Sequence, residues 1–325
     1  MREVAGNLLR NLASIPPNVS EIITNEIWSA TQYLAGSTTK RIPYEVVYGL
    51  QLALEKYKKN PVTITTAIIQ ERQFRFRGVR ANFYIYCEYL LNVKFESELI
   101  QIALPEIYRH RPLYNVALYH ELGHFIDRHQ NLTEYTLLLA PASSNHLLPG
   151  VSAKPADMSD DQYEQYQCNH RMEFFADLFA AAYTGRAIKT FLEQFAPNRS
   201  ASDSHPATGV RLQQIEALLA GNTTTIIEVF QKALTSLRLP ELAVRYKRPN
   251  VNAAFNNVRP YAIANDAEVH GILEAGTEYL QVAETRRSDP WKNCKDEDVE
   301  KVINDLIEKS IRNRMVAVRW ENGIA

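Results

Sequence analysis

The stretch from Arg171 to Tyr183, RMEFFADLFAAAY, limits the folds open to this chain more than any other segment. Apolar residues would occupy every side of a helix here, and such a helix is stable in water only when other elements surround it. Ser159 and Gln162 have the spacing of a capping box, and Gly185 supplies a stop, so we predict one helix over 159–184. A helical core must therefore enclose the second half of this segment.

The rest of the chain adds helices and one short group of strands. Between Val62 and Leu104 the residues favour a small antiparallel or mixed sheet, and we count residues 84–86 among its strands. The expected fold class is α+β, mostly helical, with the sheet packed on the helix that carries the candidate site. We expect an N-terminal helical region (1–60), a core (61–237) and a C-terminal helical region (238–325). Apolar periodicity predicts helices over 18–35, 43–58, 112–129, 206–220, 223–236, 266–286 and 295–318.

Composition limits which partners and which cellular compartment we expect for this protein. Lys plus Arg number 36 against 37 Asp plus Glu, so we expect no nucleic-acid partner. The chain lacks the roughly 18 consecutive apolar residues of a membrane-spanning helix, and Arg10 interrupts what a secretory signal would need. Cys87, Cys168 and Cys294 are odd in number and lie outside any CxxC pattern, which argues against disulfides and a thiolate zinc site. These features predict a cytoplasmic protein without a transmembrane segment.

An H-E-x-x-H motif, formed by His120, Glu121 and His124, lies within the predicted helix 112–129. Two histidines four residues apart point from one face of a helix and can bind one metal ion. Glu121 is turned by about 100° from His120 and can reach a metal-bound water without occupying the metal. Such a motif also arises by chance, and the alternative is an amphipathic helix with solvated or core histidines.

A third metal ligand must come from elsewhere in the chain. A continuation of the motif would need Gly and His at positions that hold Asp127 and Gln130, so that arrangement is rejected. The apolar helix carries Glu173 and Asp177 on one face, and buried carboxylates require compensation. We therefore expect Glu173 to bind the metal and Asp177 to accept the ring N–H of a ligating histidine. An ion pair with Arg171 or another cation is the alternative.

The motif at 120–124, followed by Glu173-Phe-Phe-Ala-Asp177, resembles the gluzincin pattern of thermolysin-type zinc peptidases. Ser204-His205-Pro206, with Arg211 downstream, is similar to an element of the CAAX prenyl protease group and its soluble minigluzincin relatives. The likeness covers about 98–220. It implies a zincin-like core and a Zn²⁺ ion, and it makes the strand near 98–104 a sheet edge that aligns an extended peptide.

The resemblance also implies that His205 or Arg211 stabilises the oxyanion. From the residues alone, the start of a helix accounts for Pro206. It does not account for His205, because histidine is a poor cap residue. The structural alternatives are a cap partner for His205 and a salt-bridging role for Arg211.

Together these features predict a zinc metallopeptidase, a hydrolase of peptide or protein substrates. In this mechanism Glu121 takes the proton of a zinc-bound water that attacks the peptide carbonyl, and later passes it to the leaving amine. Two alternatives are a metal-binding regulatory or docking protein, and a peptidase of the ImmA/IrrE type that cleaves one specific regulator.

Overall fold

A computed structural model describes residues 1–37, 44–57, 61–71, 74–139 and 158–323. It contains two compact units: a sheet unit, formed by Met1–Pro43 and Leu54–Arg109, and a helical unit, formed by Tyr44–Ala53 and His110–Ala325. The expected α+β, mostly helical fold class is confirmed. These units group the chain differently from the ranges 1–60, 61–237 and 238–325, which stay a prediction about domains. No helix of the described residues is long and apolar enough to cross a membrane.

The sheet unit holds three strands, β1 (Val62–Ile69), β2 (Arg75–Gly78) and β3 (Glu98–Pro105). β3 lies in the middle, parallel to β1 and antiparallel to β2, so the sheet is mixed. The expectation that 98–104 forms a sheet edge is therefore wrong. The seven residues of β3 after Glu98 are all buried, which is typical of a strand covered on both faces. How the sheet packs against the helix of the candidate site concerns both units and stays a prediction.

Helices α1 (Arg2–Asn11), α2 (Pro17–Ser37) and α4 (Ala81–Leu91) complete the sheet unit, with short 3-10 turns at Leu12–Ser14 and Glu106–Tyr108. Residues 84–86 belong to α4, so their assignment to a strand is wrong. Phe83, Cys87 and Leu91 are buried at a spacing of four, and this helical period outweighs the strand preference of the intervening aromatic residues.

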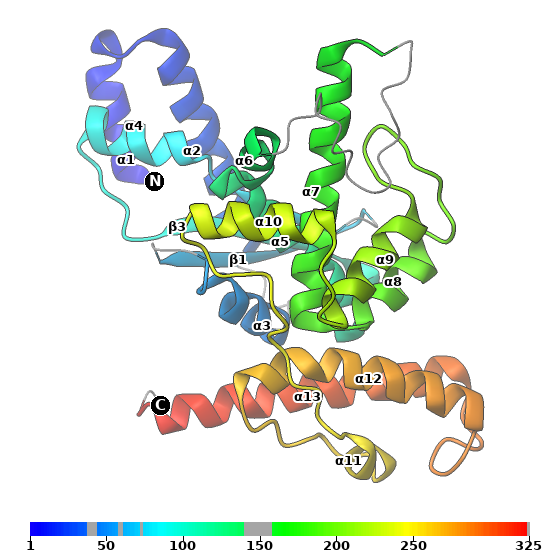
Figure 1. Ribbon diagram of the computed structural model, residues 1–325. Helices are drawn as coiled ribbons and strands as arrows, with labels where there is room; N and C mark the ends of the chain where they lie inside the picture. The colour runs from blue at the N-terminus through cyan, green and yellow to red at the C-terminus, as the bar shows by residue number, and fades with distance from the viewer. Residues whose placement is uncertain (38–43, 58–60, 72–73, 140–157, 324–325) are drawn as a thin grey trace. The chain divides into compact units, whose positions relative to one another are not determined.

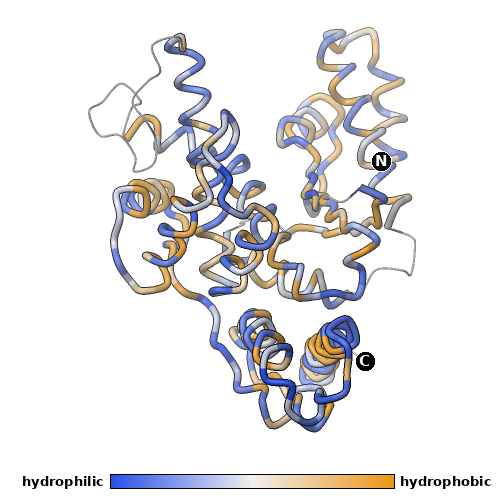
Figure 2. Tube along the Cα trace, turned by 90° about the vertical axis from the view of Figure 1, so that its right-hand side faces the viewer, coloured by the Kyte–Doolittle hydropathy of each residue, from blue (hydrophilic) through white to orange (hydrophobic). Residues whose placement is uncertain are grey.

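The helical unit is built around α7 (Asp160–Thr184), and the predicted helix 159–184 is confirmed (Figure 1). Ser159 and Gln162 form the expected capping box. Every residue from Glu173 to Thr184 is buried, whereas the N-terminal half is hydrophilic (Figure 2). The other helices are α3 (Tyr44–Leu54), α5 (Val116–Gln130), α6 (Leu132–Leu139), α8 (Ala187–Phe195), α9 (Thr208–Leu219), α10 (Thr225–Ser236), α11 (Asn252–Asn256), α12 (Asp266–Arg286) and α13 (Asp296–Glu321), with a 3-10 turn at Pro112–Asn115 before α5.

α5 packs directly on α7, and α9 packs on α7 as well. The turn from α5 to α6 is fixed by Asp127, whose carboxylate accepts hydrogen bonds from the backbone N–H of Thr133 at 2.7 Å and from its hydroxyl at 2.8 Å. Asn131, with φ of 50°, makes the sharp change of direction. These contacts fix the start of α6 against the C-terminal end of α5.

Candidate metal centre

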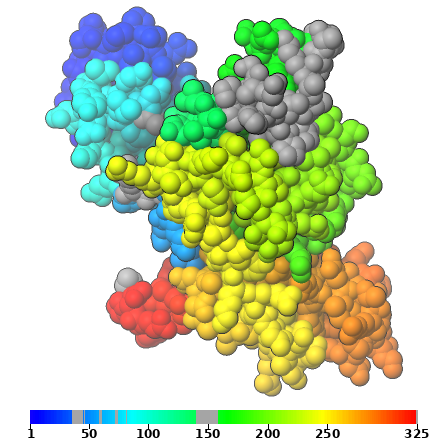
Figure 3. Space-filling model, viewed as in Figure 1, coloured from blue at the N-terminus to red at the C-terminus, as the bar shows by residue number. Residues whose placement is uncertain are grey.

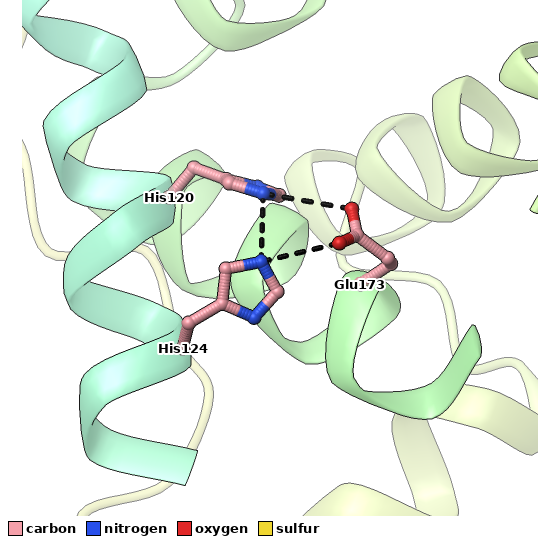
Figure 4. Close-up of side chains that lie close together, drawn as sticks. All are labelled: His120, His124 and Glu173. Carbon is pink, nitrogen blue, oxygen red and sulfur yellow. Dashed lines mark hydrogen bonds and ion pairs between the residues drawn. The ribbon is translucent and has the colours of Figure 1, made fainter. Parts of the chain in front are cut away.

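Two helices bring His120, His124 and Glu173 together, as Figure 4 shows. The histidines project from α5 and the glutamate from α7, and one ligand atom of each lies within 4.8 Å of the others. The two Nε2 atoms are 3.0 Å apart. His120 Nε2 lies 3.5 Å from Glu173 Oε2, and His124 Nε2 lies 3.2 Å from Oε1. These three side chains can hold one metal ion.

The hydrogen bonds around His120 leave the correct nitrogen for a metal. His120 Nδ1 donates to Asp177 Oδ1 at 2.9 Å, because a carboxylate can only accept, so Nε2, which lies toward Glu173 and His124, is the nitrogen left to bind a metal. Burial lowers the pKa of His120, but the hydrogen bond to Asp177 and the charge of Glu173 outweigh burial and raise it above its ordinary value. The contact that the sequence predicted for Asp177 is present.

Arg211, on α9, compensates the two buried carboxylates. Its Nε and Nη2 donate to Asp177 Oδ2 and Oδ1 at 2.6 and 2.7 Å, and Nη2 also lies 3.1 Å from Glu173 Oε2. Burial raises the pKa of Asp177, but Arg211 and then His120 outweigh burial and hold it below the ordinary value. For Glu173, burial is outweighed by the hydrogen bond with His124 and by the charges of His120 and Arg211, so its pKa is also lowered. Both carboxylates are therefore ionised.

The sequence offered an ion pair with Arg171 or another cation as the alternative to a metal, and the structure contains such a pair, with Arg211 as the cation in place of Arg171. Arg171 is buried, and its Nη1 donates to the hydroxyl of Thr136 at 3.2 Å. The sequence holds a local signal that Arg211 is buried. It lies three residues after Thr208 and four before Ile215, so the three residues share one face of α9, and all three are buried. Its partner, 34 residues away, could not be derived from the sequence because it depends on how α9 packs on α7.

His205 and Glu121 complete the set of predicted site residues. His205, on the loop between α8 and α9, places Nε2 at 3.5 Å from Glu173 Oε1, while its side chain is 54% exposed. It therefore faces both the ligand cluster and solvent. Glu121 is half-buried and follows His120 directly on α5.

Two buried polar atoms of the cluster have no hydrogen-bond partner among the described residues, and only one of them, Glu173 Oε2, is compensated by the charge of Arg211 at 3.1 Å. Among the described residues, His124 Nδ1 has no hydrogen-bond partner. Its other nitrogen, Nε2, points at His120 Nε2, and two imidazole nitrogens that both face one point are suited to a shared cation.

Comparisons with known proteins found no matching family model, no matching curated protein and no matching solved structure. The chemistry of the site is therefore argued from its geometry.

Proposed function

We propose that the protein is a zinc-dependent peptidase whose ion is held by His120, His124 and Glu173. Zn–N and Zn–O bonds of about 2.1 Å place neighbouring ligand atoms of a tetrahedral ion about 3.4 Å apart. The distances among the three side chains are 3.0, 3.2 and 3.5 Å. This match is the observation that carries the proposal. Two imidazoles and one carboxylate are also a ligand set of catalytic zinc, with the fourth position left for chemistry.

Zinc bound at this site would polarise a peptide carbonyl and lower the pKa of a water molecule. Glu121, beside His120 on α5, accepts the proton of the attacking water and passes it to the leaving amine. His205 donates a hydrogen bond from its Nε2–H to the developing oxyanion. Asp177 holds His120 in the ligating tautomer. Hydrolysis by this route needs no covalent enzyme intermediate.

His205 suits the role of oxyanion donor better than Arg211. The guanidinium of Arg211 is only 7% exposed and donates through Nε and Nη2 to Asp177. Moving it toward a substrate would leave two buried carboxylates without compensation, which costs several kcal/mol. His205 reaches the same cluster from the solvent side. We therefore assign Arg211 to holding the ligands and His205 to contacting the substrate.

A second candidate function rests on the same histidine. Nε2 of His205 lies 3.5 Å from Glu173 Oε1, so a small displacement would make it a fourth metal ligand. A site closed by four protein ligands is typical of structural zinc. The chain would then be a metal-binding regulatory or docking protein with little hydrolytic activity.

Metal analysis of natively purified protein, combined with cleavage of a peptide library, tests the proposal. We expect one zinc per chain and cleavage of peptides; cleavage of a single co-purifying protein only would identify a regulator-specific peptidase. Glu121→Gln should keep the zinc and abolish turnover, whereas His120→Ala should lose both. Glu228→Gln, an exposed glutamate on α10, is the matched control and should change neither.

Three outcomes would contradict the peptidase proposal. One is a protein without transition metal, and another is a Glu121→Gln variant that cleaves at the wild-type rate. The third concerns His205→Ala, which should retain zinc and lose turnover. If that variant loses zinc instead, His205 is a ligand and the site is a structural one.

A further inference from the structure

The loop that carries His205 is fastened to α7 one turn before Glu173. His170 Nε2 donates to the carbonyl oxygen of Ser202 at 2.7 Å, and Asn169 Nδ2 donates to that of Asp203 at 3.0 Å. Figure 1 shows this loop rising beside α7, and in Figure 3 it lies at the surface in yellow-green. The same helix therefore bears a predicted metal ligand and the two side chains that place the loop.

His170 is built as a rigid anchor. It is fully buried, and its ring lies against that of Tyr166, with centroids 4.0 Å apart and the ring planes inclined by 39°. Because the carbonyl of Ser202 can only accept, Nε2 of His170 carries the hydrogen. The side chain of His170 is already fixed by burial on a long helix. It therefore loses little further conformational entropy when it binds the loop.

Within the loop, hydrogen bonds close a compact turn around His205. Ser202 N donates to the His205 carbonyl at 2.9 Å, and His205 N donates to Ser202 Oγ at 3.2 Å. These bonds tie Ser202 to His205, so the bond from His170 to Ser202 also constrains where the imidazole of His205 lies.

The ring of His205 is also oriented by Ser204, whose Oγ lies 2.8 Å from Nδ1. On the opposite side, Nε2 faces the ionised carboxylate of Glu173, which can only accept a hydrogen bond. This arrangement selects the tautomer with hydrogen on Nε2. The hydroxyl of Ser204 must then donate to Nδ1.

We propose that His170 and Ser204 are positioning residues for His205: His170 fixes the place of the imidazole, and Ser204 fixes which of its nitrogens carries the hydrogen. The inference rests on the proposed function, in which His205 donates to the oxyanion. Neither residue touches the substrate or the predicted ligands in this scheme. Each acts through His205.

A double-mutant cycle on the full-length, zinc-loaded protein tests this inference. His170→Phe removes the donor and keeps an aromatic ring, and Ser204→Ala removes the hydroxyl. We expect each to lower kcat by about 10- to 100-fold with KM and zinc content unchanged, because misplacing a donor by about 1 Å has that effect. In a His205→Ala background the same substitutions should not lower kcat further.

Conservative variants and a control separate positioning from damage to the fold. His170→Gln and Ser204→Thr keep a donor at the same place and should recover most of the lost kcat. Ser200→Ala changes an exposed serine of the same loop and should have no effect. Losses in kcat that persist in full in the His205→Ala background would overturn the inference.

Two spectroscopic readouts do not depend on activity. Amide hydrogen exchange over 199–207 should accelerate in His170→Phe, and the ¹⁵N resonance of His205 Nδ1 should move in Ser204→Ala. If the wild-type protein cleaves no peptide, the proposed function fails, and these readouts still decide the positioning. Unchanged exchange and an unchanged Nδ1 resonance would overturn it, whatever the activity.

Discussion

Gly123 on α5 lies against the backbone of Ala176 on α7, and a Cβ at position 123 would come within 2.7 Å of the Ala176 Cα and 3.2 Å of its carbonyl oxygen. The glycine follows Glu121 by two residues and precedes His124, while Ala176 stands between Glu173 and Asp177. The two helices therefore approach closely within the candidate site. We expect the distances between the predicted ligands to depend on this contact.

Gly123→Ala should push the helices apart, because the neighbour is backbone and cannot rotate away. Overpacking of this kind costs about 1–3 kcal/mol, which outweighs the gain of about 1 kcal/mol from replacing a helical glycine by alanine. We expect a lower free energy of unfolding in urea and a zinc affinity reduced at least tenfold. Gly209→Ala on α9, where a Cβ would meet open space, is the control and should be neutral or stabilising. Unchanged zinc affinity in Gly123→Ala would show that the contact does not set the ligand spacing.

Arg211→Met should destabilise the protein by about 3–5 kcal/mol, because it leaves buried carboxylates without their cation. Asp177→Leu should have a cost of the same order, since it leaves the buried guanidinium with only Glu173. The double variant removes both charges and should cost less than the sum of the two single changes. Urea unfolding of the four proteins measures this coupling. Strict additivity would mean that the two side chains do not stabilise each other.

Asp127 makes the stability depend on pH. Burial raises the pKa of its carboxyl to about 6 in the folded protein, although the hydrogen bonds from Thr133 oppose burial. The folded state therefore binds a proton more tightly than the unfolded chain, and stability falls as pH rises from about 4 to about 6. At about 1.4 kcal/mol for each unit of pKa shift, the loss reaches about 3 kcal/mol.

Asp127→Asn removes this titration, so unfolding of the variant and the wild type should be compared from pH 4 to pH 7. At pH 4 the variant should have the lower free energy of unfolding. The difference from the wild type should shrink as the pH rises toward 7, because only the wild type loses stability. A difference that is constant across this range would contradict the raised pKa.

Removal of metal should leave the fold intact, because Arg211 already compensates the carboxylates that face the ion. With a chelator we expect an unchanged far-ultraviolet circular dichroism spectrum and a lower Tm. Zinc at 100 times its Kd should then raise the free energy of unfolding by about 2.7 kcal/mol. Loss of helical signal on chelation would show that the metal is needed for folding and that the site is not preformed.

The elements predicted best from the sequence are those with local signals. The bounds of α7 follow from its capping box and its glycine stop, and its burial follows from its apolar circumference. The grouping of His120, His124 and Glu173 was predicted because two histidines on one helix need a third ligand, and a buried carboxylate needs a cation.

Features that depend on packing between distant segments were not predicted. The central place of β3 depends on its pairing with β1 and β2, which no single strand reveals. In α4, aromatic residues with high strand preference masked a helical period. The bidentate pair of Arg211 and Asp177, and the bond from His170 to Ser202, each join residues more than 30 positions apart.

All of the predicted ligands and their charge partners stand on α5, α7 and α9, whereas His205 stands on the short connection before α9. The residues that hold the ion and the residue assigned to the oxyanion would thus lie on different parts of the chain, while the general base Glu121 stays on α5 with two of the ligands. Replacing residues 199–207 with other sequences would change the group that contacts the substrate, while the ion stays in place. The scaffold would then be a starting point from which selection, natural or directed, could obtain new reactivities without rebuilding the core.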